Sequence, residues 1–169
     1  MLERDDLLKD INGNDFIDMN NHSDWVEFFL IFSRFEYALK RSGYVKENRG
    51  YIEADWSKFG KYIEPKTEFT EITEAKKYLL ERPPRKRILE NGKLSWEAMN
   101  NLNNDVGSLI RIIKAVRNNL FHGGKYPNPV GPVKDLSRDK ELIEHSITVL
   151  KHLLCLSPEV KGYYFDTLE

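Results

Sequence analysis

Apolar residues recur at helical spacing along most of the chain, and this pattern predicts an all-α fold. An aromatic-rich stripe predicts a helix from about residue 24 to Ser42, with Ser23 or Asp24 as its N-cap and Gly43 after its end. The stripe therefore predicts a long helix with one buried face. Its residues are Trp25, Phe28, Phe29, Phe32, Phe35 and Leu39.

Two shorter helices are expected next, and each is closed by proline. The segment ADWSKFGKYI, residues 54–63, places apolar side chains at helical spacing and is followed by Pro65. In TEITEAKKYLLERPP, Thr70 or Thr73 is a candidate N-cap. The double proline ends this helix, because proline clashes with the preceding turn and lacks a backbone N–H.

The second half of the chain predicts further helices. ENGKLSW indicates a turn, after which Ser95 caps a helix that begins WEAM. A stripe over residues 106–120 leads to Gly123, which suits a left-handed C-terminal cap, and a last stripe spans residues 137–156. Because no strand pattern competes, we expect an antiparallel helical bundle with four to five main helices.

Length and composition indicate one domain, residues 24–169, after an N-terminal leader at residues 1–23. The chain has 169 residues, of which 40% are hydrophobic and 31% charged, as in ordinary globular proteins. It shows neither an apolar signal region nor a run of about 18 apolar residues, so we expect a cytoplasmic protein with no membrane partner. Cys155 is the only cysteine, which excludes an internal disulfide framework.

The formal net charge is −1, which argues against a protein that coats nucleic acid nonspecifically, but the charges are unevenly spread. Residues 1–24 contain seven carboxylates and two basic side chains, and this segment would repel phosphate. Residues 106–134 contain five basic side chains and no carboxylate. A second basic cluster, RPPRKRILENGK at residues 82–93, is interpreted as a solvated loop.

The acid-free segment contains VRNNLFHGGKY, which predicts a site for an anionic ligand at a helix end. Arg117 carries a planar, permanently charged guanidinium that suits phosphate, and His122 can move protons near neutral pH. Asn118 lies four residues before His122 and shares its helix face. Arg117 lies beside the buried stripe, so it must be paired or face another chain. The alternative is structural, because basic side chains near a helix C-terminus also stabilise the helix dipole.

RNNLFH matches the signature of the HEPN superfamily, in which an arginine, a polar residue and three variable residues precede a histidine. Members are small α-helical bundles, and the resemblance covers about residues 24–156. Many members resemble metal-independent ribonucleases of toxin–antitoxin, phage-defence and RNA-processing systems, and others serve as binding modules. Members paired with a nucleotidyltransferase antitoxin often carry a tyrosine two residues after the histidine. This chain has Gly124 there and so departs from that branch.

The resemblance implies endonucleolytic RNA cleavage without metal or cofactor, in which a ribose 2′-hydroxyl attacks the neighbouring phosphorus and leaves a cyclic phosphate. The catalytic residues it implies are Arg117, Asn118 and His122. One histidine cannot conveniently act as both base and acid in one turnover, so two copies in a homodimer would share one cleft. The implied partners are RNA, a second copy of the chain and, for a toxin, a protein antitoxin.

Further substrate contacts are predicted for Arg111, Lys114, Lys125 and Glu36. Glu36 is interpreted either as a partner of Arg117 or as an ordinary exposed glutamate. The four histidines contain no pair at four-residue spacing, so no metal site is expected. The alternative function is a non-catalytic HEPN-like module that binds a nucleotide or a partner protein.

Overall fold

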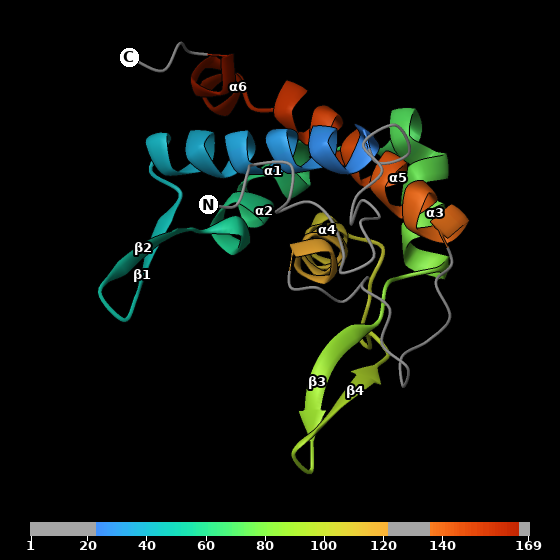
Figure 1. Ribbon diagram of the computed structural model, residues 1–169. Coiled ribbons are helices and arrows are strands. Elements are labelled where there is room, and N and C mark those ends of the chain that lie inside the picture. The colour runs from blue at the N-terminus through green and yellow to red at the C-terminus, as the bar shows by residue number, and fades with distance from the viewer. Residues whose placement is uncertain (1–22, 122–135, 166–169) are drawn as a thin grey trace, which may run out of the picture.

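The chain forms six α-helices and two antiparallel β-hairpins within the part that the structure describes (Figure 1). The structure is a computed structural model, and it describes residues 23–121 and 136–165. The predicted leader therefore lies outside the described residues, apart from Ser23. The elements are α1 (Ser23–Arg41), β1 (Val45–Asn48), β2 (Tyr51–Ala54), α2 (Trp56–Ile63), the 3₁₀ helices η2 (Glu64–Lys66) and η3 (Phe69–Ile72), α3 (Thr73–Glu81), β3 (Lys86–Glu90), β4 (Lys93–Glu97), α4 (Val106–Phe121), α5 (Leu136–Cys155) and α6 (Pro158–Phe165).

The helices expected at the five apolar stripes are confirmed. α1 ends at Arg41, and Gly43 follows with a φ of +76°, a conformation that favours glycine. α2 begins after Asp55, whose carboxylate accepts a hydrogen bond from the backbone N–H of Lys58 at 2.9 Å. α3, α4 and α5 occupy the remaining stripes. α6 is an additional helix that the apolar pattern does not predict; it begins at Pro158, where proline is tolerated in a first turn.

The prediction of an all-α fold is confirmed only in part, because the mostly helical chain also contains two hairpins. β1 pairs with β2, and β3 pairs with β4. Arg49 and Gly50 form the first turn with φ angles of 52° and 81°, and Asn91 and Gly92 form the second with 50° and 74°. Two successive positive φ angles give a turn whose twist matches that of the flanking strands. The fold is therefore mostly helical, with two small hairpins.

The second hairpin corrects two expectations. Ser95 caps no helix, because Trp96 lies in β4 directly opposite Arg87 of β3. The basic segment 82–93, expected as a loop, contains the whole of β3 and the turn. Opposite charges face each other across the strands and favour this pairing over a helix. These pairs are Lys86 with Glu97 and Glu90 with Lys93.

The core lies where α1 and α4 meet the other helices. α1 packs against α5 and α6, whereas α4 packs against α2 and α3, and both hairpins project from this helical body (Figure 1). The core is aromatic where α1 meets α2, since Phe35 stacks on Trp56 with ring centroids 5.0 Å apart and meets Phe59 edge-on at 5.6 Å. No helix among the described residues is long and apolar enough to cross a membrane.

Candidate functional site

The predicted motif lies at the C-terminal end of α4, and the structure describes part of it. Arg117 and Asn118 lie in the last turns of α4. His122, Gly123 and Lys125 lie outside the described residues. The relation of the arginine to the histidine therefore stays a prediction. The described part of the candidate site is the arginine and the side chains around it.

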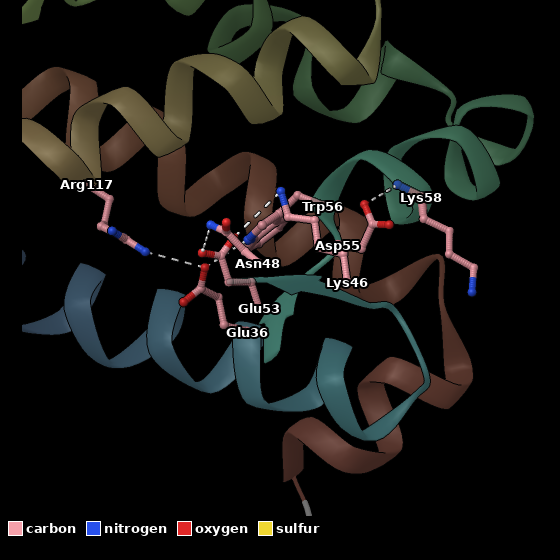
Figure 2. Close-up of polar contacts among 8 residues, drawn as sticks. All are labelled: Glu36, Lys46, Asn48, Glu53, Asp55, Trp56, Lys58 and Arg117. Atoms are coloured by element: carbon pink, nitrogen blue, oxygen red, sulfur yellow. Dashed lines mark hydrogen bonds and ion pairs between the residues drawn. The ribbon is translucent and has the colours of Figure 1, made fainter. Parts of the chain in front are cut away.

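Described neighbours on two helices hold the guanidinium of Arg117. Its Nη2 lies 3.5 Å from Oε1 of Glu36 in α1 (Figure 2). Its Nη1 donates to Oδ1 of Asn118 at 2.9 Å, and its Cζ lies 5.0 Å from the ring centroid of Phe32. The side chain remains 30% exposed. Of the two expectations for a charge beside the apolar stripe, pairing within the protomer is therefore confirmed, and water or a ligand can still reach the guanidinium.

Glu36 is held in place by a buried tryptophan. The Nε1–H of Trp56 donates to the same oxygen, Glu36 Oε1, at 3.0 Å. Trp56 is 4% exposed, and its ring stacks on Phe32 and Phe35 at centroid distances of 5.2 and 5.0 Å. Because packing fixes the indole, it also fixes the carboxylate that faces Arg117. The pairing of Glu36 with Arg117, one of its two interpretations, is confirmed, and one oxygen atom joins α1, α2 and α4.

Lys114 is a second cation of α4, one turn before Arg117. Burial lowers the pKa of the Lys114 ammonium below its ordinary value, and the positive charge of Lys46 in β1 lowers it further. The carboxylates of Glu36 and Glu53 act in the opposite direction. No carboxylate of the described residues lies within ion-pair distance of Lys114. Lys114 therefore carries a partly buried charge near a second cation.

The β1–β2 hairpin supplies a side of the site that the sequence pattern does not predict. Lys46 Nζ lies 3.7 Å from Glu53 Oε2, and Asn48 Nδ2 donates to Glu53 Oε1 at 2.8 Å. The hydrogen bond from Asn48 is the main reason why the pKa of Glu53 is below its usual range, and the Lys46 charge adds to it. Glu53 is therefore an anion near neutral pH. A signal for this hairpin is the Arg49–Gly50 pair between two short runs that include β-branched residues.

Two other polar residues of α4 have structural contacts. Arg111 donates from Nη1 and Nη2 to the carbonyl oxygens of Asn101 and Asn100, at 2.8 and 3.0 Å, and so braces the loop before α4. Asn119 donates from Nδ2 to the carbonyl oxygen of Arg85 at 2.9 Å and ties α4 to the root of β3. The structure thus brings Glu36, Lys114 and Asn118 to Arg117, whereas Arg111 donates to the carbonyl oxygens of the preceding loop.

The side chains around Arg117 include cations and carboxylates, but the described residues form no set of metal ligands. Among residues 23–121 and 136–165, no group of three His, Cys, Asp or Glu side chains is placed to hold a metal ion. What the arrangement offers is a held, partly exposed guanidinium one turn from Lys114, which in turn interacts with Lys46, and these cations suit an anion. No family model, curated protein or solved structure matches the chain.

Proposed function

We propose that the protein is a metal-independent endoribonuclease of the HEPN type, with Arg117, Asn118 and His122 as its catalytic residues. The observation that carries the proposal is the state of Arg117, which is held by Glu36 and Asn118 yet remains partly exposed at the end of α4. A guanidinium held in this way can bind phosphate without first being ordered. His122 follows Arg117 by five residues in the sequence.

Arg117 and His122 have different roles in the proposed reaction, which follow from their chemistry. A base removes the proton of the ribose 2′-hydroxyl, the O2′–P bond forms, the P–O5′ bond breaks, and an acid protonates the departing 5′-oxygen. Arg117 offsets the charge that grows on the phosphoryl oxygens. His122 moves protons, and its counterpart in a second subunit takes the other role, so the active species is a homodimer. In a toxin or phage-defence effector, a protein antitoxin would restrain this activity.

A non-catalytic HEPN-like module that binds a nucleotide or a protein is the second candidate. The observation that favours it is that Glu36 and Asn118 already engage both terminal nitrogens of Arg117 within one protomer. Their contacts reduce the capacity of the guanidinium to stabilise a developing charge. The two candidates differ in their need for His122, because only cleavage requires a group that transfers protons.

The decisive experiment is incubation of the purified chain with total RNA in the presence of a chelator, followed by mapping of the cut ends. We expect cuts that leave cyclic phosphate ends, and we expect Arg117→Ala and His122→Ala to abolish them. His145→Ala is the matched control, since His145 lies in α5 and packs on the ring of Tyr78. Cleavage that survives in folded His122→Ala protein contradicts the proposal, as does a parent chain that binds RNA without cutting it. Light scattering of the eluted protein tests the homodimer.

A further inference from the structure

The β1–β2 hairpin has two different faces. Residues that are directly opposite in an antiparallel pair point to the same side, and successive residues alternate. The register pairs Lys46 with Glu53 and Asn48 with Tyr51, so these four side chains share one face. Ile52, the neighbour of Tyr51, lies on the other face. One face is therefore polar and aromatic, and the other contains no cation.

The polar face of the hairpin adjoins α4. The charges of Lys46 and Glu53 both act on the ammonium of Lys114, together with those of Glu36 and Arg117. Figure 2 shows Lys46, Asn48 and Glu53 of the hairpin in one view with Glu36, which is itself joined to Arg117. The hairpin and the candidate catalytic arginine therefore belong to one charged surface.

This surface has more positive than negative groups. Its cations are Lys46, Lys114 and Arg117, and each of its two carboxylates already has a partner, since Glu36 pairs with Arg117 and Glu53 with Lys46. Burial is the largest cause of the lowered pKa of Lys114, and repulsion by Lys46 is the next, while Glu36 and Glu53 act in the opposite direction. A bound phosphate would offset that repulsion, so the surface fits a polyanion.

An exposed aromatic ring completes the surface. Tyr51 is 76% exposed, directly after the turn of the hairpin and on the same face as Lys46. One exposed aromatic ring alone indicates nothing, because proteins commonly expose apolar side chains. An exposed ring that shares a face with a cation can bind single-stranded nucleic acid, with a phosphate on the cation and a base stacked on the ring.

We propose that the β1–β2 hairpin and α4 form a subsite for single-stranded RNA, in which Lys46 and Lys114 hold backbone phosphates and Tyr51 stacks on a base. The proposal rests on the proposed function, because it states how the substrate is held beside Arg117. It commits to a substrate whose bases are unpaired, since a base within a duplex cannot stack on a side chain.

The test is RNA binding by the full chain carrying His122→Ala, which keeps the probe intact. The probe is a short fluorescein-labelled single-stranded RNA of mixed sequence, read by fluorescence anisotropy. We expect Tyr51→Ala to weaken binding about tenfold and Tyr51→Phe to retain it, because the ring does the stacking. Ile52→Ala is the matched control, since Ile52 is adjacent, 67% exposed and on the opposite face. It should bind as the His122→Ala parent does.

The phosphate contacts need their own readout. Lys46→Gln and Lys114→Gln should each weaken binding and reduce the slope of log affinity against log salt by about 0.7. Lys61→Gln, a change at an exposed lysine of α2, is the charge control. With an abasic oligonucleotide the Tyr51→Ala effect should disappear while the lysine effects remain, which separates stacking from phosphate binding.

The outcomes distinguish this inference from the proposed function. If the His122→Ala chain binds no RNA, or if Tyr51→Ala and Ile52→Ala bind equally, the subsite is refuted, even when the parent chain cleaves RNA. A preference for the same sequence as a duplex also overturns it. Conversely, if binding depends on Tyr51 but the parent chain with His122 cleaves no RNA, the subsite is supported and the proposed ribonuclease activity is contradicted.

Discussion

Arg117 and Glu36 lie 81 residues apart in the chain, yet their side chains meet at 3.5 Å. The oxygen of Glu36 that faces the guanidinium also accepts the indole N–H of Trp56 at 3.0 Å. The packing of α1 against α2 thereby positions the carboxylate of Glu36, which pairs with Arg117 of α4. Stability and the candidate chemistry are coupled at one carboxylate.

Replacement of Glu36 tests this coupling. Glu36→Ala should lower the free energy of unfolding by about 1 to 3 kcal/mol, because the buried Nε1–H of Trp56 loses its acceptor. Glu36→Gln keeps an acceptor oxygen and loses only a partly exposed ion pair, so its cost should stay below about 1 kcal/mol. Urea unfolding of the two variants measures both values. Glu27→Ala, which removes a solvent-exposed ion pair with Lys151, is the control. Equal losses for Ala and Gln would contradict the role of the tryptophan.

The shape of the Arg117 side chain should matter as well as its charge. Arg117→Lys keeps a cation but loses the planar fork that contacts Glu36 and Asn118 and suits phosphate. If the protein is a ribonuclease, the cleavage rate should fall about a hundredfold, whereas the unfolding free energy should change by less than about 1 kcal/mol. Initial rates on one RNA substrate give the first value. Arg41→Lys in α1 should cleave normally, and an unimpaired Arg117→Lys enzyme would remove Arg117 from catalysis.

Helices α1 to α5 can be predicted from the sequence because each has a buried apolar face, as Phe28, Phe32 and Phe35 show for α1. The hairpins cannot be predicted by the same means. Their strands have four or five residues and lack a buried face, so the sequence shows no clear alternation of apolar and polar residues. The pair Asn91–Gly92 nevertheless indicates the second hairpin in the sequence, because Asn-Gly favours a type I′ hairpin turn.

The candidate site divides in the same way. Arg117 stands out because its residue type and position are local properties of the sequence, and Glu36 is a plausible partner because it lies among the apolar positions of α1. The contact with Trp56 depends on how α2 packs against α1, which no local pattern contains. Lys46 and Glu53 reach the site only through the first hairpin, so they are missed whenever the hairpin is missed.

The side chain of Asn119 should hold the second hairpin to α4. Asn119 is buried and donates to the carbonyl oxygen of Arg85. Asn119→Ala leaves that carbonyl without its donor and should cost about 1 to 3 kcal/mol of unfolding free energy. Amide hydrogen exchange in β3 should accelerate, since the root of the strand loses its attachment. Asn118→Ala, one residue earlier and exposed, is the matched control and should leave exchange in β3 unchanged.

Lys114 should make stability depend on pH in the alkaline range. Its folded-state pKa lies below the ordinary value of 10.5, so the unfolded chain binds more protons between the two values. The cost of the buried charge is fully present below the lowered pKa, and it fades as pH rises through that pKa toward 10.5. Lys114→Met removes this cost. The variant should therefore gain stability over the parent near neutral pH, and the pH-dependent part of the gain should vanish in alkali.

Urea unfolding of the parent and the Lys114→Met chain across this range measures the difference, in which other titrating groups cancel. Lys61→Met is the control, because an exposed lysine of α2 should show no such dependence. If the advantage of Lys114→Met instead grows with pH, nearby carboxylates outweigh burial and the repulsion from Lys46. The surface around Lys114 would then be balanced in charge, and an anion would gain nothing by binding there.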